Sequence, residues 1–218
     1  MQDLKVALAH RKFDLGRKDL SDVVKAKVIK EVEGAIDAND MTFVYQHFCS
    51  HLGWAENAAS LAKMREANEA KLKEIDEKIA ECEKNEGDEE VRDALLERAD
   101  YLCNIGDKEG AWKAYEEVVK KSANANLKLT IAFCKIRLEL LLGNWSDIKQ
   151  LLEDARQVCD KAGDWEKKNR LMVCSPATSP ASIHQPRLDP WKGGLPILPL
   201  QSIAGPQSRL GLSYNGGI

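Results

Sequence analysis

Proline is confined to the last part of this chain. All seven prolines of the 218 residues lie between Pro176 and Pro206. Proline cannot donate a backbone hydrogen bond and breaks the interior of a helix. The preceding 175 residues contain none, and such a stretch predicts helices joined by short turns. Residues 172–218 also hold six of the 14 glycines, so the chain divides into two unlike parts near Met172.

The charged residues follow the opposite distribution. Residues 172–218 contain three of the 32 Lys and Arg residues and one of the 35 Asp and Glu residues, which leaves a net charge of −5 on residues 1–171. A mildly acidic body without a Lys/Arg cluster argues against nucleic acid or an anionic membrane as a partner. No apolar run approaches the roughly 18 residues needed to cross a bilayer, and the first residues lack the apolar region of a signal peptide. We therefore expect a soluble intracellular protein.

Apolar periodicity predicts a succession of helices. Val24, Val28, Val32 and Ile36 recur every four residues, which indicates a helix that starts near Ser21. Residues 41–52 continue this pattern, with Val44, Phe48 and Leu52 on one face. Residues 55–84 are rich in Ala, Glu and Lys, and their short heptad seam is interrupted by Arg65 and Asn68. That interruption favours a rod lying across neighbouring helices over an autonomous coiled coil.

Glycine-containing turns divide residues 88–171 into helix pairs. Gly106 and Gly143 each end an apolar pattern and are 37 residues apart, a spacing typical of stacked helix-pair repeats. The six positions at the spacing of the tetratricopeptide (TPR) small–small–aromatic pattern are Ala99, Gly106, Ala111, Tyr115, Gly143 and Ala155. The second unit is degenerate, because Ile148 stands where a small residue is expected. We predict an all-α, TPR-like right-handed helical-repeat solenoid over residues 1–171, with an irregular Pro/Gly-rich C-terminal tail.

Few side chains suggest chemistry. His47 and His51 share a helix face and could ligate a metal ion, but no Glu lies between them as in zinc proteases and no third ligand is evident. A helix end with exposed or capping histidines is the favoured interpretation. Trp54, Trp145 and Trp165 follow helix-ending glycines and are expected to seal joints between repeats. The six cysteines are widely spaced, which favours buried thiols over disulfides or a zinc cage. We expect no catalytic residue, no metal and no cofactor.

Four segments stand out as more specific than a generic helix-pair pattern: ERADYLCNIGDKEGAWKAYEEV (97–118), GDWEKKNRL (163–171), REANEAKLKEIDEKIAECEKN (65–85) and QDLKVALAHRKFDL near the start. They resemble segments of a known family, the non-ATPase lid subunit 6 of the 26S proteasome regulatory particle. The resemblance extends over about residues 2–171. The first subunit of the COP9 signalosome, a paralogue, shares this architecture, and the IGDKEGA turn and the GDW-basic-NRL junction favour the proteasome family.

This resemblance implies a non-catalytic scaffold that supports ubiquitin-dependent protein degradation through protein–protein contacts. It implies other lid subunits and the ATPase ring as partners, with no nucleic acid, membrane or small-molecule substrate, and a location in cytoplasm and nucleus. Family members continue into further repeats and a PCI domain, a helical stretch ending in a winged helix. Here Leu171 is followed by the proline-rich residues 172–218. We therefore expect an alternative or frame-shifted ending that lacks regular structure, an absent PCI domain, and poor assembly.

Two other functions remain as alternatives. A free-standing repeat adaptor would bind peptides in a concave groove, as helical solenoids often do. A metal hydrolase would depend on His47 and His51. The P-x-x-P at Pro196–Pro199 is an SH3-ligand pattern, but it is a common chance match in a proline-rich segment.

Overall fold

The computed structural model describes residues 3–17, 19–85, 87–122, 124–162 and 165–174, and over these residues the regular secondary structure is α-helical. Of the irregular tail expected over residues 172–218, residues 175–218 lie outside the described residues. The helices are α1 (Leu4–Gly16), α2 (Asp22–Asp37), α3 (Thr42–Leu52), α4 (Ala58–Asn85), α5 (Asp88–Ile105), α6 (Lys108–Lys121), α7 (Ala125–Leu142), α8 (Trp145–Ala162) and α9 (Trp165–Cys174).

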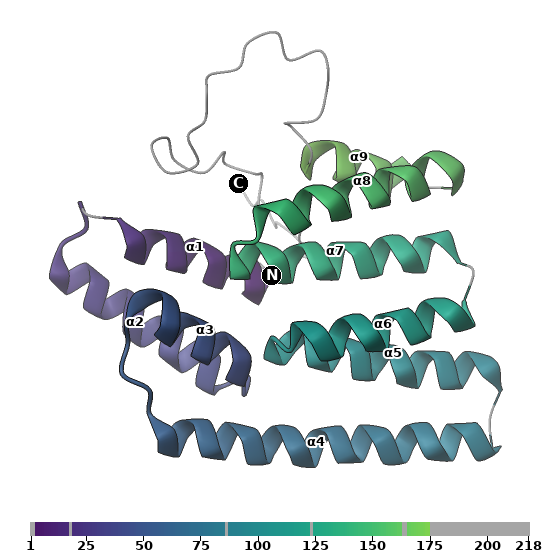
Figure 1. The fold of residues 1–218 in the computed structure, drawn as a ribbon, viewed down its shortest axis with the longest axis horizontal. Coiled ribbons are helices and arrows are strands. Elements are labelled where there is room, and N and C mark those ends of the chain that lie inside the picture. The colour runs from purple at the N-terminus through teal and green to yellow at the C-terminus, as the bar shows by residue number, and fades with distance from the viewer. Residues whose placement is uncertain (1–2, 18, 86, 123, 163–164, 175–218) are drawn as a thin grey trace, which may run out of the picture.

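The helices are stacked in successive layers (Figure 1). The long helix α4 forms one edge and packs on α5, which pairs with α6. The next pair is α7 with α8, and α9 lies against α8. Helix α1 lies beside α7, and α2 and α3 complete the N-terminal end of the stack. The described chain is thus an all-α helical-repeat solenoid, as the sequence predicted.

Helix α7 is the centre of the packing. Three clusters of buried side chains form the core: one among α4 to α7, one among α1 to α4, and one among α7 to α9. Helix α7 contributes to all three, with Ile131 and Leu138 in the first, Leu141 in the second, and Leu129, Phe133 and Ile136 in the third. A helix buried on several sides needs apolar residues around its circumference, which explains the sequence of α7.

Left-handed glycines end three of the helices. Gly53, Gly106 and Gly143 have φ values of 69°, 90° and 88°, a region that glycine adopts without steric cost. After Gly106, the Asp107 side chain caps α6 by accepting a hydrogen bond from the Gly110 backbone N–H (3.0 Å). The helix ends thus fall where the glycine-containing turns predicted them. The fourth such turn, at Gly163, lies outside the described residues.

Gly106 meets a second requirement that its sequence context did not reveal. A Cβ atom at this position would lie 2.7 Å from Cγ2 and 3.1 Å from the backbone N of Val44, in α3. Helix α3 therefore packs directly on the α5–α6 turn. Gly106 serves both the left-handed turn and the docking of the N-terminal helices.

Three features differ from the sequence-based expectations. Residues 4–16 form a helix, α1, which no apolar period indicated. Val24 was expected on the buried face of α2 but is 47% exposed, because burial on this helix begins at Val28 and its first turn extends beyond the covering helices. Helix α9 continues to Cys174, past the expected boundary at Leu171.

Three glycine-to-alanine variants test this account of the turns. We expect Gly106→Ala to lower the free energy of unfolding by about 2–4 kcal/mol, because backbone strain and overpacking against Val44 add. Gly143→Ala should lower the free energy of unfolding by about 1 kcal/mol, from backbone strain alone. The added Cβ atom would meet no close neighbour, the nearest atom being Lys12 Nζ at 3.7 Å. The control Gly34→Ala, within α2 and with nothing within 4 Å, should stabilise by about 0.5–1 kcal/mol. Urea unfolding followed by circular dichroism measures all three, and equal effects would contradict the account.

Candidate functional site

The carboxyl end of α7 is capped by a lysine from α1. Lys12 Nζ donates hydrogen bonds to the carbonyl oxygens of Leu141 (3.0 Å) and Leu142 (3.1 Å), which belong to the last turn and have no partner within the helix. The same nitrogen lies 2.6 Å from Nε2 of His47 on α3. The ammonium also faces the negative end of the α7 dipole. One side chain therefore joins α1, α3 and α7.

The close contact between Lys12 and His47 fixes their protonation states. Burial lowers the pKa of Lys12 to about 8. Burial, followed by the charge of Lys12 and by His51, lowers the pKa of His47 to about 4. At neutral pH the ammonium of Lys12 donates and the neutral imidazole of His47 accepts, because two cations would repel at this distance.

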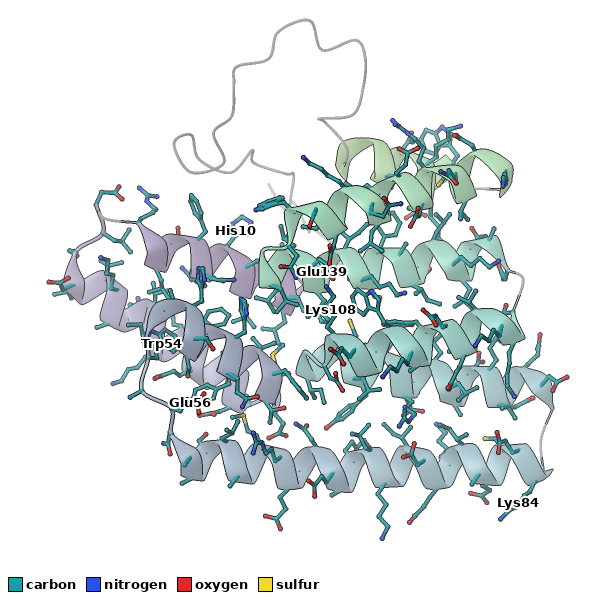
Figure 2. The ribbon with its side chains drawn as sticks, in the orientation of Figure 1. His10, Trp54, Glu56, Lys84, Lys108 and Glu139 are labelled. Atoms are coloured by element: carbon teal, nitrogen blue, oxygen red, sulfur yellow. The ribbon has the colours of Figure 1, made fainter. Side chains whose placement is uncertain are left out.

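A buried carboxylate braces the same end of α7 from the other side. Glu139 is fully buried, and its Oε1 lies 2.7 Å from Nζ of Lys108, the first residue of α6. The two atoms form an ion pair, but they do not meet the geometry of a hydrogen bond. Asn144 Nδ2 donates to Glu139 Oε2 (2.8 Å), and Lys108 also pairs with Asp147 of α8 (2.7 Å). Figure 2 shows Lys108 and Glu139 meeting between α6 and α7.

Lys108 stays charged in this environment. Burial alone would lower its pKa, but the hydrogen bond to Asp147 and the charges of Glu139 and Asp147 outweigh burial and raise the pKa of Lys108. The turn between α7 and α8 is therefore fixed by an ammonium that bridges two carboxylates. It links the α5–α6 pair to the α7–α8 pair.

A second ion pair ties the start of α1 to the middle of α7. Arg137 Nη1 donates to Asp3 Oδ2 at 2.6 Å, and the two side chains are only 14% and 19% exposed. Asp3 also caps α1 by accepting from the Lys5 backbone N–H (3.0 Å). Because residue 3 contacts residue 137 and residue 12 contacts residues 141 and 142, α1 and α7 run in the same direction.

Asn68, which interrupts the heptad seam of α4, joins three helices. Its Nδ2 donates to the Asp40 carbonyl oxygen (2.9 Å) and to Thr42 Oγ1 (3.2 Å), and its Oδ1 accepts from the Tyr101 hydroxyl (2.8 Å). Asp40 has a left-handed φ of 48°, which a non-glycine residue rarely adopts. Asn68 thus holds a strained turn between α2 and α3 while it links α4 to α5.

The predicted repeat positions lie inside or at the ends of the two helix pairs. Ala99, Ala111 and Tyr115 are fully buried between α5 and α6, and the Tyr115 hydroxyl donates to Asp100 Oδ1 (2.6 Å). Ala155 is buried between α7 and α8, as is Ile148, which replaces the expected small residue. Gly106 and Gly143 end α5 and α7. A shared role of these positions as a repeat signature stays a prediction.

His47 and His51 lie together without a third metal ligand from the part of the chain that the structure describes. Their rings stack at 5.9 Å between centroids, and the Lys12 ammonium occupies the space next to His47 Nε2. Among the described residues, no group of three or more His, Cys, Asp or Glu side chains is placed to hold a metal ion.

Two of the three tryptophans differ from the expectation that they seal joints between repeats. Trp54 packs against Phe48, with ring centroids 5.8 Å apart. Trp145 is 44% exposed and Trp165 is 78% exposed. The other large apolar side chains that are exposed within the described residues are Phe13, Val23, Val24 and Phe43. The described part of the chain leaves these apolar side chains uncovered.

Sequence reasoning missed the polar side chains that join the helices. Glu139 gave a usable signal, because a carboxylate in the middle of the apolar segment LTIAFCKIRLELLL must be buried and must have a cationic partner. Its partner Lys108 could not be chosen from among the many lysines by sequence. Lys12 and Arg137 contact residues about 130 positions away, so no local pattern indicates them.

The architecture defines a helical-repeat protein whose polar side chains join one helix to another. A family model described as "26S proteasome subunit RPN7" matches residues 57–177, more than half of the chain. The chain belongs to this family. It is similar to the 26S proteasome non-ATPase regulatory subunit 6 of Caenorhabditis elegans, with 32% identity over 164 residues, and to that of Dictyostelium discoideum, with 34% identity over 145 residues.

These matches extend over 75% and 66% of the chain and over 40% and 37% of the two relatives. The 26S proteasome regulatory subunit rpn7 of Schizosaccharomyces pombe is 35% identical over 111 residues, which are 51% of the chain and 28% of the relative. The chain therefore spans about two fifths of the length of the first of these relatives. Within the described residues, none of the helices is both long enough and apolar enough to cross a membrane.

The Lys108–Glu139 pair should show strong coupling in a double-mutant cycle. Lys108→Met leaves the Glu139 carboxylate buried without its cation. We expect the free energy of unfolding to fall by about 3 kcal/mol. This value is at the lower end of the range for breaking a buried ion pair, because Lys108 is partly exposed. Glu139→Gln in the Lys108→Met background should recover more than half of this loss. Additive single effects in urea unfolding would contradict the coupling.

His47 should make the chain less stable in acid. Its folded-state pKa of about 4 is below the ordinary 6.5, so between these values the unfolded state binds more protons and stability falls as pH falls. His47→Asn should therefore flatten the dependence of the unfolding midpoint on pH between 6.5 and 4. His51→Asn should flatten it less, because His51 is exposed. An unchanged slope in the His47 variant would refute the assignment.

Proposed function

We propose that the chain is a non-catalytic scaffold of the lid of the proteasome regulatory particle. It would support ubiquitin-dependent protein degradation in cytoplasm and nucleus through contacts with other lid subunits and the ATPase ring, without nucleic acid or membrane partners. Residues 1–171 would act as one helical-repeat domain. The observation that carries the proposal is membership of the RPN7 family, whose relatives are named as regulatory subunits of the 26S proteasome.

The distribution of side chains supports a scaffold role. The buried Glu139 and the partly buried Lys12 and Arg137 of the candidate site are all occupied by contacts between helices. Large apolar side chains are exposed on the surface instead, the most exposed being Val23 (82%) on α2 and Trp165 (78%) on α9. Exposed apolar side chains of this size fit contacts with neighbouring proteins.

Native electrophoresis of the tagged chain, expressed in cells or mixed with recombinant lid subunits, tests the proposal. We expect a fraction of it to migrate with proteasome lid complexes and the remainder to stay free, in keeping with the poor assembly predicted from the sequence. Val23→Ser and Trp165→Ser should each reduce this fraction severalfold, whereas the exposed controls Lys27→Ser and Glu153→Ser should not. Circular dichroism establishes that each variant remains folded.

Two results would contradict the proposal. One is a folded chain that migrates only as a free monomer and retains short peptides, which would indicate a repeat adaptor. The other is migration with the COP9 signalosome in place of the proteasome lid.

A further inference from the structure

The two lysines at the carboxyl end of α7 differ in what holds their protons. Lys108 pairs with two carboxylates, and its pKa is raised. The partners that the described residues give to Lys12 are two backbone carbonyl oxygens of α7 and the neutral imidazole of His47. Because none of these partners is a carboxylate, burial decides, and the pKa of Lys12 falls to about 8.

This proton affinity leaves a usable fraction of Lys12 as the neutral amine. At pH 7 a pKa of about 8 leaves about one side chain in ten neutral, whereas the ordinary lysine pKa of about 10.4 leaves about one in 2,500. The neutral amine has the lone pair with which nitrogen attacks an electrophilic carbon atom. Removal of water from around a lysine is one of the ways in which proteins activate it as a nucleophile.

The amine of Lys12 also has a base beside it. His47 Nε2 lies 2.6 Å from Lys12 Nζ, within the distance expected between a nucleophile and its base. Because the pKa of His47 is about 4, its imidazole is neutral at neutral pH and can accept a proton. A base this weak suffices, since a nitrogen that has just bonded to a tetrahedral carbon is far more acidic than a free ammonium.

An approach to Lys12 is open at the turn between α7 and α8. Gly143 in this turn is exposed. Apart from its neighbours in the chain, a Cβ atom at Gly143 would have one described atom within 4 Å, which is Lys12 Nζ at 3.7 Å. The missing side chain thus leaves space beside the amine, next to solvent. Space of this size suits a short acyl group.

We propose that Lys12 is an acylation site, at which Nζ attacks the carbonyl carbon of a short acyl thioester and His47 accepts the proton that the nitrogen releases. A bond forms between Nζ and the carbonyl carbon, and the carbon–sulfur bond breaks. The proton passes from His47 to the sulfur, and the thiol leaves. For the attack, the amine turns toward Gly143 and gives up one of its hydrogen bonds to α7.

Acylation of Lys12 would weaken the contact between α1 and α7. An acylated lysine has no charge and keeps a single N–H, so it can donate to one of the two carbonyl oxygens that the ammonium now binds. The favourable interaction with the negative end of the α7 dipole is also lost. The proposal assigns a modification to this junction and does not depend on the scaffold role.

Acetylation of the folded full chain by a small thioester, S-acetyl-N-acetylcysteamine, tests the proposal. Mass spectrometry measures the initial rate at each lysine, divided by the rate at the same lysine in the chain unfolded in urea. We expect this relative rate at Lys12 to exceed that at Lys5 by about fivefold or more. Lys5 is a matched control, because it is also half-buried on α1 but donates to Asn104 and not to an imidazole.

Two histidine variants test the role of the base. His47→Asn should lower the relative rate at Lys12 about threefold or more and leave the rate at Lys5 within about twofold. His51→Asn, which changes the ring stacked on His47, should leave the rate at Lys12 within about twofold. Circular dichroism establishes that both variants remain folded.

Two results would overturn the proposal. One is a relative rate at Lys12 equal to or below that at Lys5 in the unmodified chain, which would show a structural lysine that burial protects. This comparison requires no substitution. The other is an equal relative rate at Lys12 in the unmodified chain and in folded His47→Asn.

Discussion

Burial of α7 on several sides is the constraint on which the rest of the structure depends. Its side chains enter all three apolar clusters, and α1, α5, α6 and α8 pack directly on this helix. The last carbonyls of such a helix need partners outside the helix, and the negative end of its dipole favours a nearby cation. Two lysines answer that requirement. Lys12 binds the terminal carbonyls, and Lys108 neutralises Glu139 one turn earlier.

These charged side chains fix the positions of α1 and α6 along α7 more than they raise the free energy of unfolding. An apolar surface alone would allow α1 and α6 to slide along α7, whereas an ion pair or a carbonyl cap is satisfied in one register. A buried pair such as Lys108 and Glu139 contributes little net free energy compared with apolar residues of the same shape. For the proposed scaffold, its value would be a fixed geometry, since neighbouring proteins could bind surfaces on different helices only if those helices keep their relative positions.

The sequence predicted the features that arise locally. The absence of proline, the apolar periods and the turns at Gly106 and Gly143 were sufficient for the helical-repeat fold, and the family resemblance agrees with the RPN7 match. The polar contacts that join α1 to α7 could not be predicted, because Lys12 and Arg137 bind residues that only the tertiary fold brings near. Helix α1 was missed because of its pattern of apolar residues. Its apolar residues serve more than one neighbour and so show no single period.

Hydrogen exchange followed by mass spectrometry tests the double bracing of α7 most directly. The measured quantity is amide protection in peptides that cover α1, α3 and the α7–α8 turn, compared between the unmodified chain, Lys12→Met and Lys108→Met. The account predicts that Lys12→Met lowers protection in α1 and the facing part of α3, while Lys108→Met lowers it in the α7–α8 turn and the start of α6. Identical loss across all these segments in both variants would contradict it, as would unchanged protection of α1 in Lys12→Met.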